Sequence, residues 1–142
     1  MKGLTRIMAI SAILVSLYGA GLIFVPHLVA GEYGISLTPQ TVPLTQLLGA
    51  YFIGFGLLNW LSSKSTSMEV LTLVTLADFV TDLITLAISG IERYHGILNI
   101  WGWEIFVLHL FFASAFGYYL FRLRAKTNTS VLAAGTNVPT TP

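Results

Sequence analysis

The sequence predicts an all-α protein, a four-helix transmembrane bundle with both termini in the cytoplasm. Of its 142 residues, 55% are hydrophobic and 9% are charged, whereas a soluble domain carries about 25% charged residues. The apolar residues gather into four blocks that are each long enough to cross about 30 Å of hydrocarbon as a helix. Lys and Arg residues gather on one side of these blocks, and this asymmetry predicts the orientation.

The four predicted spans are residues 5–25, 44–62, 68–89 and 97–121, within a membrane domain of residues 1–126. The first span follows Lys2 and Arg6, as the apolar part of a signal peptide would. Its apolar run is long, however, and no convincing small-residue cleavage site follows it, so we interpret it as a span. Residues 127–142 are rich in Thr, Asn, Ala and Pro, and we expect a disordered cytoplasmic tail there.

The basic residues predict which ends of the spans face the cytoplasm. Arg93 lies on one side of the predicted membrane, and the other six lie on the opposite side: Lys2, Arg6, Lys64, Arg122, Arg124 and Lys126. The positive-inside rule therefore places both termini in the cytoplasm, as expected in a plasma membrane of the bacterial type. The connections 26–43 and 90–96 then face outward, and the first of them is expected to hold a short interfacial piece around residues 27–33.

Small residues at four-residue spacing predict that the first two spans pack closely together. On the first span Ala12, Ser16 and Ala20 follow this spacing, with Gly19 and Gly21 alongside. On the second span Ala50 and Gly54 follow it, with Gly49 and Gly56 flanking them. Small side chains let two helix backbones approach where water supplies no hydrophobic drive. The alternative interpretation is a glycine-lined path for a ligand or an ion.

The third span carries a polar face in an otherwise apolar helix. Two aspartates near the centre of a span cost about 5 to 7 kcal/mol on an insertion scale. Three-four spacing puts five polar residues on one side of the helix, namely Thr75, Asp78, Asp82, Thr85 and Ser89. We expect this face to point towards the other helices, where partners or water can satisfy it.

Depth in the membrane suggests which polar side chains lie together. Counted from the span ends, Asp78 and His109 lie near the midplane, Asp82 and Glu104 lie in the outer half, and Asn59 lies apart in the inner half. We predict a polar pocket open towards the outer leaflet, built from Tyr18, Gln46, Tyr51, Asp78, Asp82, Glu104 and His109.

The charges of this predicted pocket do not balance. Asp78, Asp82 and Glu104 have no Lys or Arg at their depth in the spans. Because a low dielectric penalises unpaired charge, we expect at least one of these carboxyl groups to be protonated at neutral pH. The two aspartates either form a proton, cation or ligand site or make hydrogen bonds that fix the bundle. His109 is either a proton-relay partner of Asp78 or a core histidine bonded to a backbone carbonyl.

Composition excludes several classes of function. The chain has no cysteine, which excludes disulfides, thiolate catalysis and Cys-ligated zinc. Its net charge of +1 gives no electrostatic footprint for nucleic acid. Carboxylates with an imidazole suit some metal ions, but the spacing of Glu104 and His109 differs from the Glu-x-x-His of di-iron bundles. We therefore predict no metal and no cofactor.

One stretch resembles a known grouping of membrane proteins. The glycine-patterned run from Thr45 to Trp60 follows a Pro-rich loop that contains Glu32-Tyr33-Gly34-Ile35. Together they resemble the small, mostly uncharacterised four-helix membrane proteins of the DoxX-like grouping, over about residues 8–124. The resemblance implies a compact bundle, usually without an assigned activity. Because some members are associated with quinone-linked redox complexes, it also implies a role as a partner or quinone-contacting subunit, and it transfers no functional residue to this chain.

Three functions remain open from the sequence. The first is a polar intramembrane pocket that binds or passes a proton, a cation or a small amphipathic ligand. The second is an accessory subunit that forms a homo-oligomer or docks against a larger membrane complex. The third, which we favour least, is an intramembrane enzyme whose acid and histidine pass protons to a lipid-like substrate, as isomerases do.

Overall fold

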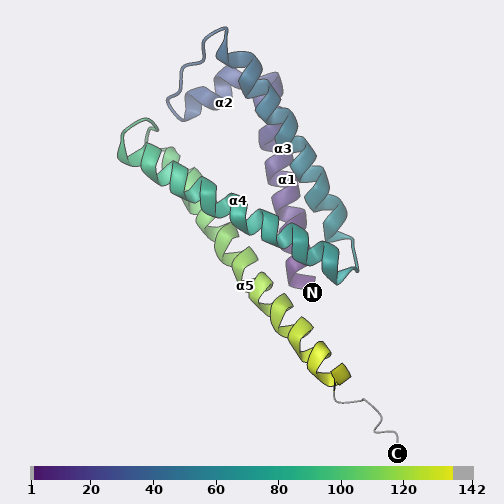
Figure 1. Ribbon diagram of the computed structural model, residues 1–142. Coiled ribbons are helices and arrows are strands. Elements are labelled where there is room, and N and C mark those ends of the chain that lie inside the picture. Colours follow the sequence, from purple (N-terminus) through teal and green to yellow (C-terminus); the bar gives the residue numbers. More distant parts are fainter. Residues whose placement is uncertain (1, 136–142) are drawn as a thin grey trace, which may run out of the picture.

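The computed structural model describes residues 2–135, and the side chains of residues 2–125. Over this part of the chain it has five helices and no strands (Figure 1). They are α1 Lys2–Phe24, α2 Pro26–Glu32, α3 Thr41–Ser63, α4 Met68–Tyr94 and α5 Gly102–Gly135. All but α2 contain a stretch long and apolar enough to cross a membrane. The predicted all-α class with four transmembrane helices is therefore confirmed, whereas the cytoplasmic placement of the termini stays a prediction.

The connection between α4 and α5 lies further along the chain than predicted. Helix α4 continues to Tyr94 and α5 begins at Gly102, whereas the sequence placed these boundaries at residues 89 and 97. Gly90 does not end α4, because glycine costs a helix only about 1 kcal/mol. The helix stops at Gly96, whose φ of 70° is the left-handed conformation that glycine adopts just beyond a helix end.

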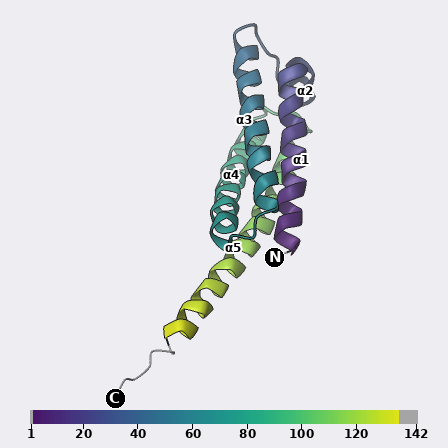
Figure 2. The same ribbon diagram turned by 90° about the vertical axis from the view of Figure 1, so that its right-hand side faces the viewer.

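Helix α5 is the longest element and extends beyond the other helices at its C-terminal end (Figures 1 and 2). Its apolar, membrane-length part is Gly102–Ala125. The helix continues to Gly135, and so covers the first part of the segment 127–142 that we expected to be disordered. Residues 136–142 of that segment lie outside the described residues.

The predicted short piece after the first span is confirmed as helix α2. Pro26 is its first residue, a position where the missing N–H of proline costs no hydrogen bond. Val25 is bonded to Gly21 O through its backbone N–H (2.8 Å), so the chain turns directly from α1 into α2. Gly34, with φ 82°, then reverses the chain towards α3.

The four long helices form two hairpins, one of α1 with α3 and one of α4 with α5 (Figure 2). The N-terminus and the turn between α3 and α4 lie at one end, which also holds Lys2 and Lys64 and is called here the basic end (Figure 1). The opposite end, formed by α2 and the α4–α5 connection at residues 95–101, is called the α2 end. The hairpins are close at the basic end and diverge towards the α2 end.

Glycine backbones form the contact within the α1/α3 hairpin. A Cβ added at Gly19 would lie 2.6 Å from the carbonyl oxygen of Gly49, and one added at Gly56 would lie 2.9 Å from that of Ala12. The prediction that α1 and α3 pack through small residues is therefore confirmed for Ala12 and Gly19. It is wrong for Ala50 and Gly54, which are exposed, because they lie on a different face of α3 from Gly49 and Gly56.

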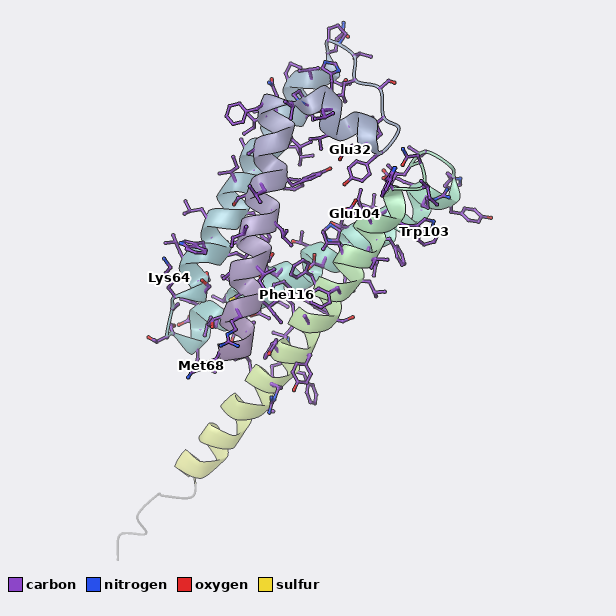
Figure 3. All side chains as sticks on the ribbon, turned by 180° about the vertical axis from the view of Figure 1, so that it is seen from behind. Glu32, Lys64, Met68, Trp103, Glu104 and Phe116 are labelled. Carbon is purple, nitrogen blue, oxygen red and sulfur yellow. The ribbon has the colours of Figure 1, made fainter. Side chains whose placement is uncertain are left out.

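An apolar cluster joins the two hairpins near the basic end. Phe116 is 1% exposed and stacks on Phe112, with ring centroids 5.9 Å apart, and Figure 3 shows it where α1 and α5 meet. Close packing of such side chains gains van der Waals contact, which stabilises the association of helices in a membrane. The cluster comprises Leu4, Met8, Leu71, Val74, Phe112, Phe116 and Leu123.

Asn99 joins the hairpins at the α2 end. Its backbone N–H donates to the carbonyl oxygen of Tyr33 (3.1 Å), and its Nδ2 donates to that of Glu32 (2.7 Å). Its Oδ1 accepts from the backbone N–H of Trp101 (2.9 Å). One asparagine therefore satisfies carbonyls at the end of α2 that lack a partner within that helix, and it ties α2 to the α4–α5 connection.

We expect Gly19→Ala to lower the free energy of unfolding by about 1 to 3 kcal/mol, the usual cost of overpacking, because the new methyl group would press on the backbone of α3. Gly54→Ala is the matched control, since a Cβ there meets nothing within 4 Å. It should leave stability unchanged or raise it by up to about 1 kcal/mol through helix propensity. Unfolding in detergent, followed by circular dichroism, measures the stability of both variants. Equal changes in the free energy of unfolding would contradict the glycine contact between α1 and α3.

Candidate functional site

The polar face of α4 is turned towards the other helices, as the sequence predicted. Thr75, Asp78, Asp82 and Ser89 are buried, while the exposed side of the same helix carries Leu73, Val80, Leu83 and Ile84. The hydroxyl of Thr75 donates to the carbonyl oxygen of Leu71 in its own helix. The two aspartates accept their side-chain hydrogen bonds from neighbouring helices.

Asp78 finds its partner on α3. Its Oδ1 accepts a hydrogen bond from Nδ2 of Asn59 (2.9 Å), and the two residues are 1% and 0% exposed. The same Asn59 Nδ2 also lies 3.4 Å from the carbonyl oxygen of Phe55. This bond links the two hairpins in the interior of the molecule, between the apolar cluster and the α2 end.

Asn59 was set aside in the sequence prediction because it lies nearer to the basic end than Asp78, and that inference was wrong. Side chains lean towards the N-terminus of their own helix. Asn59 therefore leans away from the α3–α4 turn while Asp78 leans towards it, and the difference in depth is closed. The inclination of α4 to α3 (Figure 1) adds to this approach. The available signal was an amide side chain inside an apolar span.

Asp82 finds its partner on α5. Its Oδ1 lies 2.7 Å from Nδ1 of His109, and the side chains are 11% and 26% exposed. Within residues 2–125 this is the only contact between a carboxylate and a basic side chain at ion-pair distance. A carboxylate at Nδ1 favours the tautomer with the proton on that nitrogen, and it leaves Nε2 as the acceptor in the neutral ring.

The sequence left His109 either as a partner of Asp78 or as a core histidine bonded to a backbone carbonyl, and the structure pairs it with Asp82 instead. The error follows from the position of the α4–α5 connection. Because α4 ends at Tyr94 and α5 begins at Gly102, both boundaries lie five residues later than expected. This displacement shifts α5 along α4, so that His109 lies opposite the aspartate one turn further on.

The α2 end of the site is aromatic and acidic. The rings of Tyr18 and Tyr33 meet edge to face with centroids 6.4 Å apart, and Figure 3 shows Glu32 and Glu104 at this end of the molecule. Burial raises the pKa of the Tyr33 hydroxyl, and the charges of Glu104 and Glu32 raise it further. Tyr33 therefore stays a neutral phenol at physiological pH. Sequence analysis did not include it among the site residues, because it lies in a loop.

Two residues of the predicted pocket have other surroundings. Nε2 of Gln46 donates to the carbonyl oxygen of Ile23 (3.0 Å), and so satisfies one of the free carbonyls at the end of α1. Tyr51 is 75% exposed and lies about 200° around α3 from Gly49, away from α1. The structure thus brings Asp82 and His109 together, gives Asp78 a separate partner, and leaves Gln46 and Tyr51 outside this group.

No group of three or more His, Asp or Glu side chains in the described part of the chain is arranged to hold a metal ion. No family model, no curated protein and no solved structure matches this chain. The resemblance to the DoxX-like grouping therefore stays a prediction. What can be said of the chemistry comes from the two polar pairs and from their surroundings.

A double-mutant cycle should measure the link between α4 and α5. We expect Asp82→Leu and His109→Leu to destabilise the protein singly, because each leaves a polar partner without a bond in an apolar interior. The double variant should lose less than the sum, with a coupling of about 0.5 to 2 kcal/mol. Ser114→Ala is the matched control, since its hydroxyl bonds within α5 to Leu110 O. Additive effects in detergent unfolding would mean that the two side chains do not interact.

Proposed function

We propose that this chain is a multi-pass membrane protein whose Asp82–His109 pair binds a proton and hydrogen-bonds to the polar group of a small amphipathic ligand. The observation that carries the proposal is the 2.7 Å contact between Asp82 Oδ1 and His109 Nδ1. This contact joins an acid to a base in the interior of an apolar protein, where ionisable groups mark functional sites by default.

The exposure of His109 supports binding rather than a purely structural bond. Its side chain is 26% exposed, whereas Asp78 and Asn59 are sealed from their surroundings. The imidazole uses Nδ1 for Asp82, so Nε2 remains for a ligand. Nε2 accepts a hydrogen bond in the neutral ring and donates one in the imidazolium, which couples ligand binding to the state of the proton.

The charge of the pair supports proton exchange. An ionised Asp82 beside a neutral His109 carries one negative charge, and uptake of a proton by the imidazole makes the pair neutral overall. A proton can therefore be bound here without placing net charge in a low-dielectric region. The carboxylate fixes the orientation of the ring in both states, as it does in carboxylate–histidine pairs at other sites.

The surroundings favour a ligand whose head group is cationic or neutral. Glu104 and Glu32 both act on Tyr33, and Tyr18 presents its ring beside it. The guanidinium of Arg93, in the last turn of α4, lies 5.7 Å from the ring centroid of Trp103, in the first turn of α5. Aromatic faces and carboxylates attract organic cations. Because the Arg93 cation is already placed over the Trp103 ring, the two carboxylates give this end of the site its preference for a cationic head group.

Nitrogen-15 spectra of histidine test the proposal on the protein in detergent micelles. We expect the neutral ring of His109 to show the Nδ1–H tautomer, because Asp82 accepts from that nitrogen. In Asp82→Asn the tautomer preference should be lost, because the amide can accept or donate. His95→Gln, in the α4–α5 connection, is the matched control. A His109 ring that keeps its tautomer in Asp82→Asn would count against the pair.

The ligand part of the proposal is tested with simple amphiphiles. Dodecyltrimethylammonium should shift the His109 signals in a saturable way, whereas dodecyl sulfate at equal concentration should not, because of the acidic surroundings. Glu104→Gln should weaken the response to the cation by several-fold. Equal responses to both amphiphiles would contradict the predicted preference for cations.

A second candidate function is that of a subunit in a larger membrane assembly. Ala50 and Gly54 lie four residues apart on an exposed face of α3, and a Cβ at Gly54 meets nothing within 4 Å. Such spacing is typical of helix–helix interfaces in membranes. Gly54→Leu should then reduce the oligomeric mass measured by native mass spectrometry, whereas Leu57→Val nearby should not. An unchanged mass for both variants would remove this candidate.

A further inference from the structure

The Asp78–Asn59 contact leaves two buried oxygen atoms unused. Nδ2 of Asn59 donates to Oδ1 of Asp78, but Oδ2 of Asp78 and Oδ1 of Asn59 have no hydrogen-bond partner among the described residues. Both atoms are inaccessible from outside. Since buried polar atoms in native proteins are nearly always bonded, this pair of orphaned acceptors requires an explanation.

The surroundings of Asp78 do not favour an ionised carboxylate. Asn59 carries no charge, and the neighbouring hydroxyl of Thr75 donates to Leu71 O. The nearest titratable group on α4 is Asp82, whose charge would repel that of Asp78, and the imidazole on α5 is bonded to Asp82 rather than to Asp78. Asp82 thus has a partner that can become a cation, and Asp78 has none.

We infer that Asp78 is a protonated carboxylic acid, whose Oδ2–H donates to Oδ1 of Asn59 and closes a two-bond acid–amide pair that locks α3 to α4. One proton on Oδ2 converts two orphaned acceptors into a donor and an acceptor. Each group then both donates and accepts, and no charge is buried. This inference does not depend on the proposed function of Asp82 and His109.

The position of the pair makes it a lock between the hairpins. The apolar cluster joins the hairpins near the basic end, and Asn99 joins them at the α2 end. Between these two contacts, the side chains of Asn59 and Asp78 make the hydrogen bond that joins α3 to α4 within residues 2–125. Loss of the proton would remove one of the two bonds and place a second negative charge one turn from Asp82. Both changes would favour separation of the hairpins, so the proton on Asp78 stabilises the closed arrangement.

Infrared spectroscopy of the full chain tests the inference directly. At neutral pH the wild type should show the carbonyl stretching band of a protonated carboxylic acid. This band should be absent in Asp78→Asn and retained in the matched control Asp82→Asn. If wild type and Asp78→Asn have the same acid band, the inference is overturned. The absence of any acid band in the wild type would overturn the inference as well. That result would indicate an ionised Asp78, for example one bridged to Asn59 by a buried water.

A swapped variant gives a second test that does not rely on a single substitution. In Asn59→Asp with Asp78→Asn, the acid and the amide exchange helices, and a neutral acid–amide pair should form equally well. We expect an acid band and an unfolding midpoint like those of the wild type. Asp78→Ala alone should lower the midpoint. A swapped protein that is ionised, or no more stable than Asp78→Ala, would refute the lock.

Spin labels measure the closed arrangement itself. Because the chain has no cysteine, single cysteines at the exposed positions Phe24 and Tyr94 can carry labels on the two hairpins at the α2 end. The distance distribution should be the same in wild type and Asp78→Asn, since an amide can replace the neutral acid in both bonds. It should broaden in Asp78→Ala. If the distance distribution broadens in Asp78→Asn, the arrangement depends on a charged Asp78, and the inference of a neutral acid is overturned.

Discussion

Two aspartates in an apolar helix impose the constraint that organises this molecule. A carboxyl group away from water must receive hydrogen bonds from nearby groups, and within the described residues the side-chain partners of Asp78 and Asp82 lie on α3 and α5 rather than on α4. Asp78 is bonded by Asn59 of α3, and Asp82 is bonded by His109 of α5. The polar face of α4 therefore bonds to α3 of the other hairpin and to α5 of its own hairpin, and hydrogen bonds as well as packing fix the position of this helix.

The contacts within the α1/α3 hairpin and the contacts between the two hairpins depend on different physical interactions. Helices α1 and α3 approach through glycine, because the absence of a side chain at Gly19 and Gly49 lets the backbones touch. The two hairpins meet through apolar side chains such as Phe116 near the basic end, and through Asn99 at the α2 end. Between these contacts the Asn59–Asp78 hydrogen bond joins the two hairpins, whereas the Asp82–His109 contact lies within the α4/α5 hairpin.

The two aspartates have partners of different chemistry, an amide for Asp78 and an imidazole for Asp82. Asn59 cannot change its charge, so its bond to Asp78 suits a neutral acid and a permanent link. His109 can take up a proton, so its bond to Asp82 suits exchange. The exposed fraction of each pair agrees with this division, because the Asn59–Asp78 pair is buried and His109 is partly exposed. Under the proposed function, one polar face on α4 thus serves both structure and chemistry.

The sequence alone determined the helical class, the existence of four long apolar helices and the inward direction of the polar face, because these follow from composition and from the periodicity of a helix. It did not determine which partners the aspartates take. That choice depended on where Gly96 ends α4, which set the register of α5 and moved His109 from Asp78 to Asp82. It also depended on the inclination of α4 and the lean of side chains along a helix, which brought Asn59 to Asp78. The inclination and the lean are properties of how helices cross in space, and no local pattern encodes them. Gly96 is a local signal, but Gly90 offered an earlier end for the same helix.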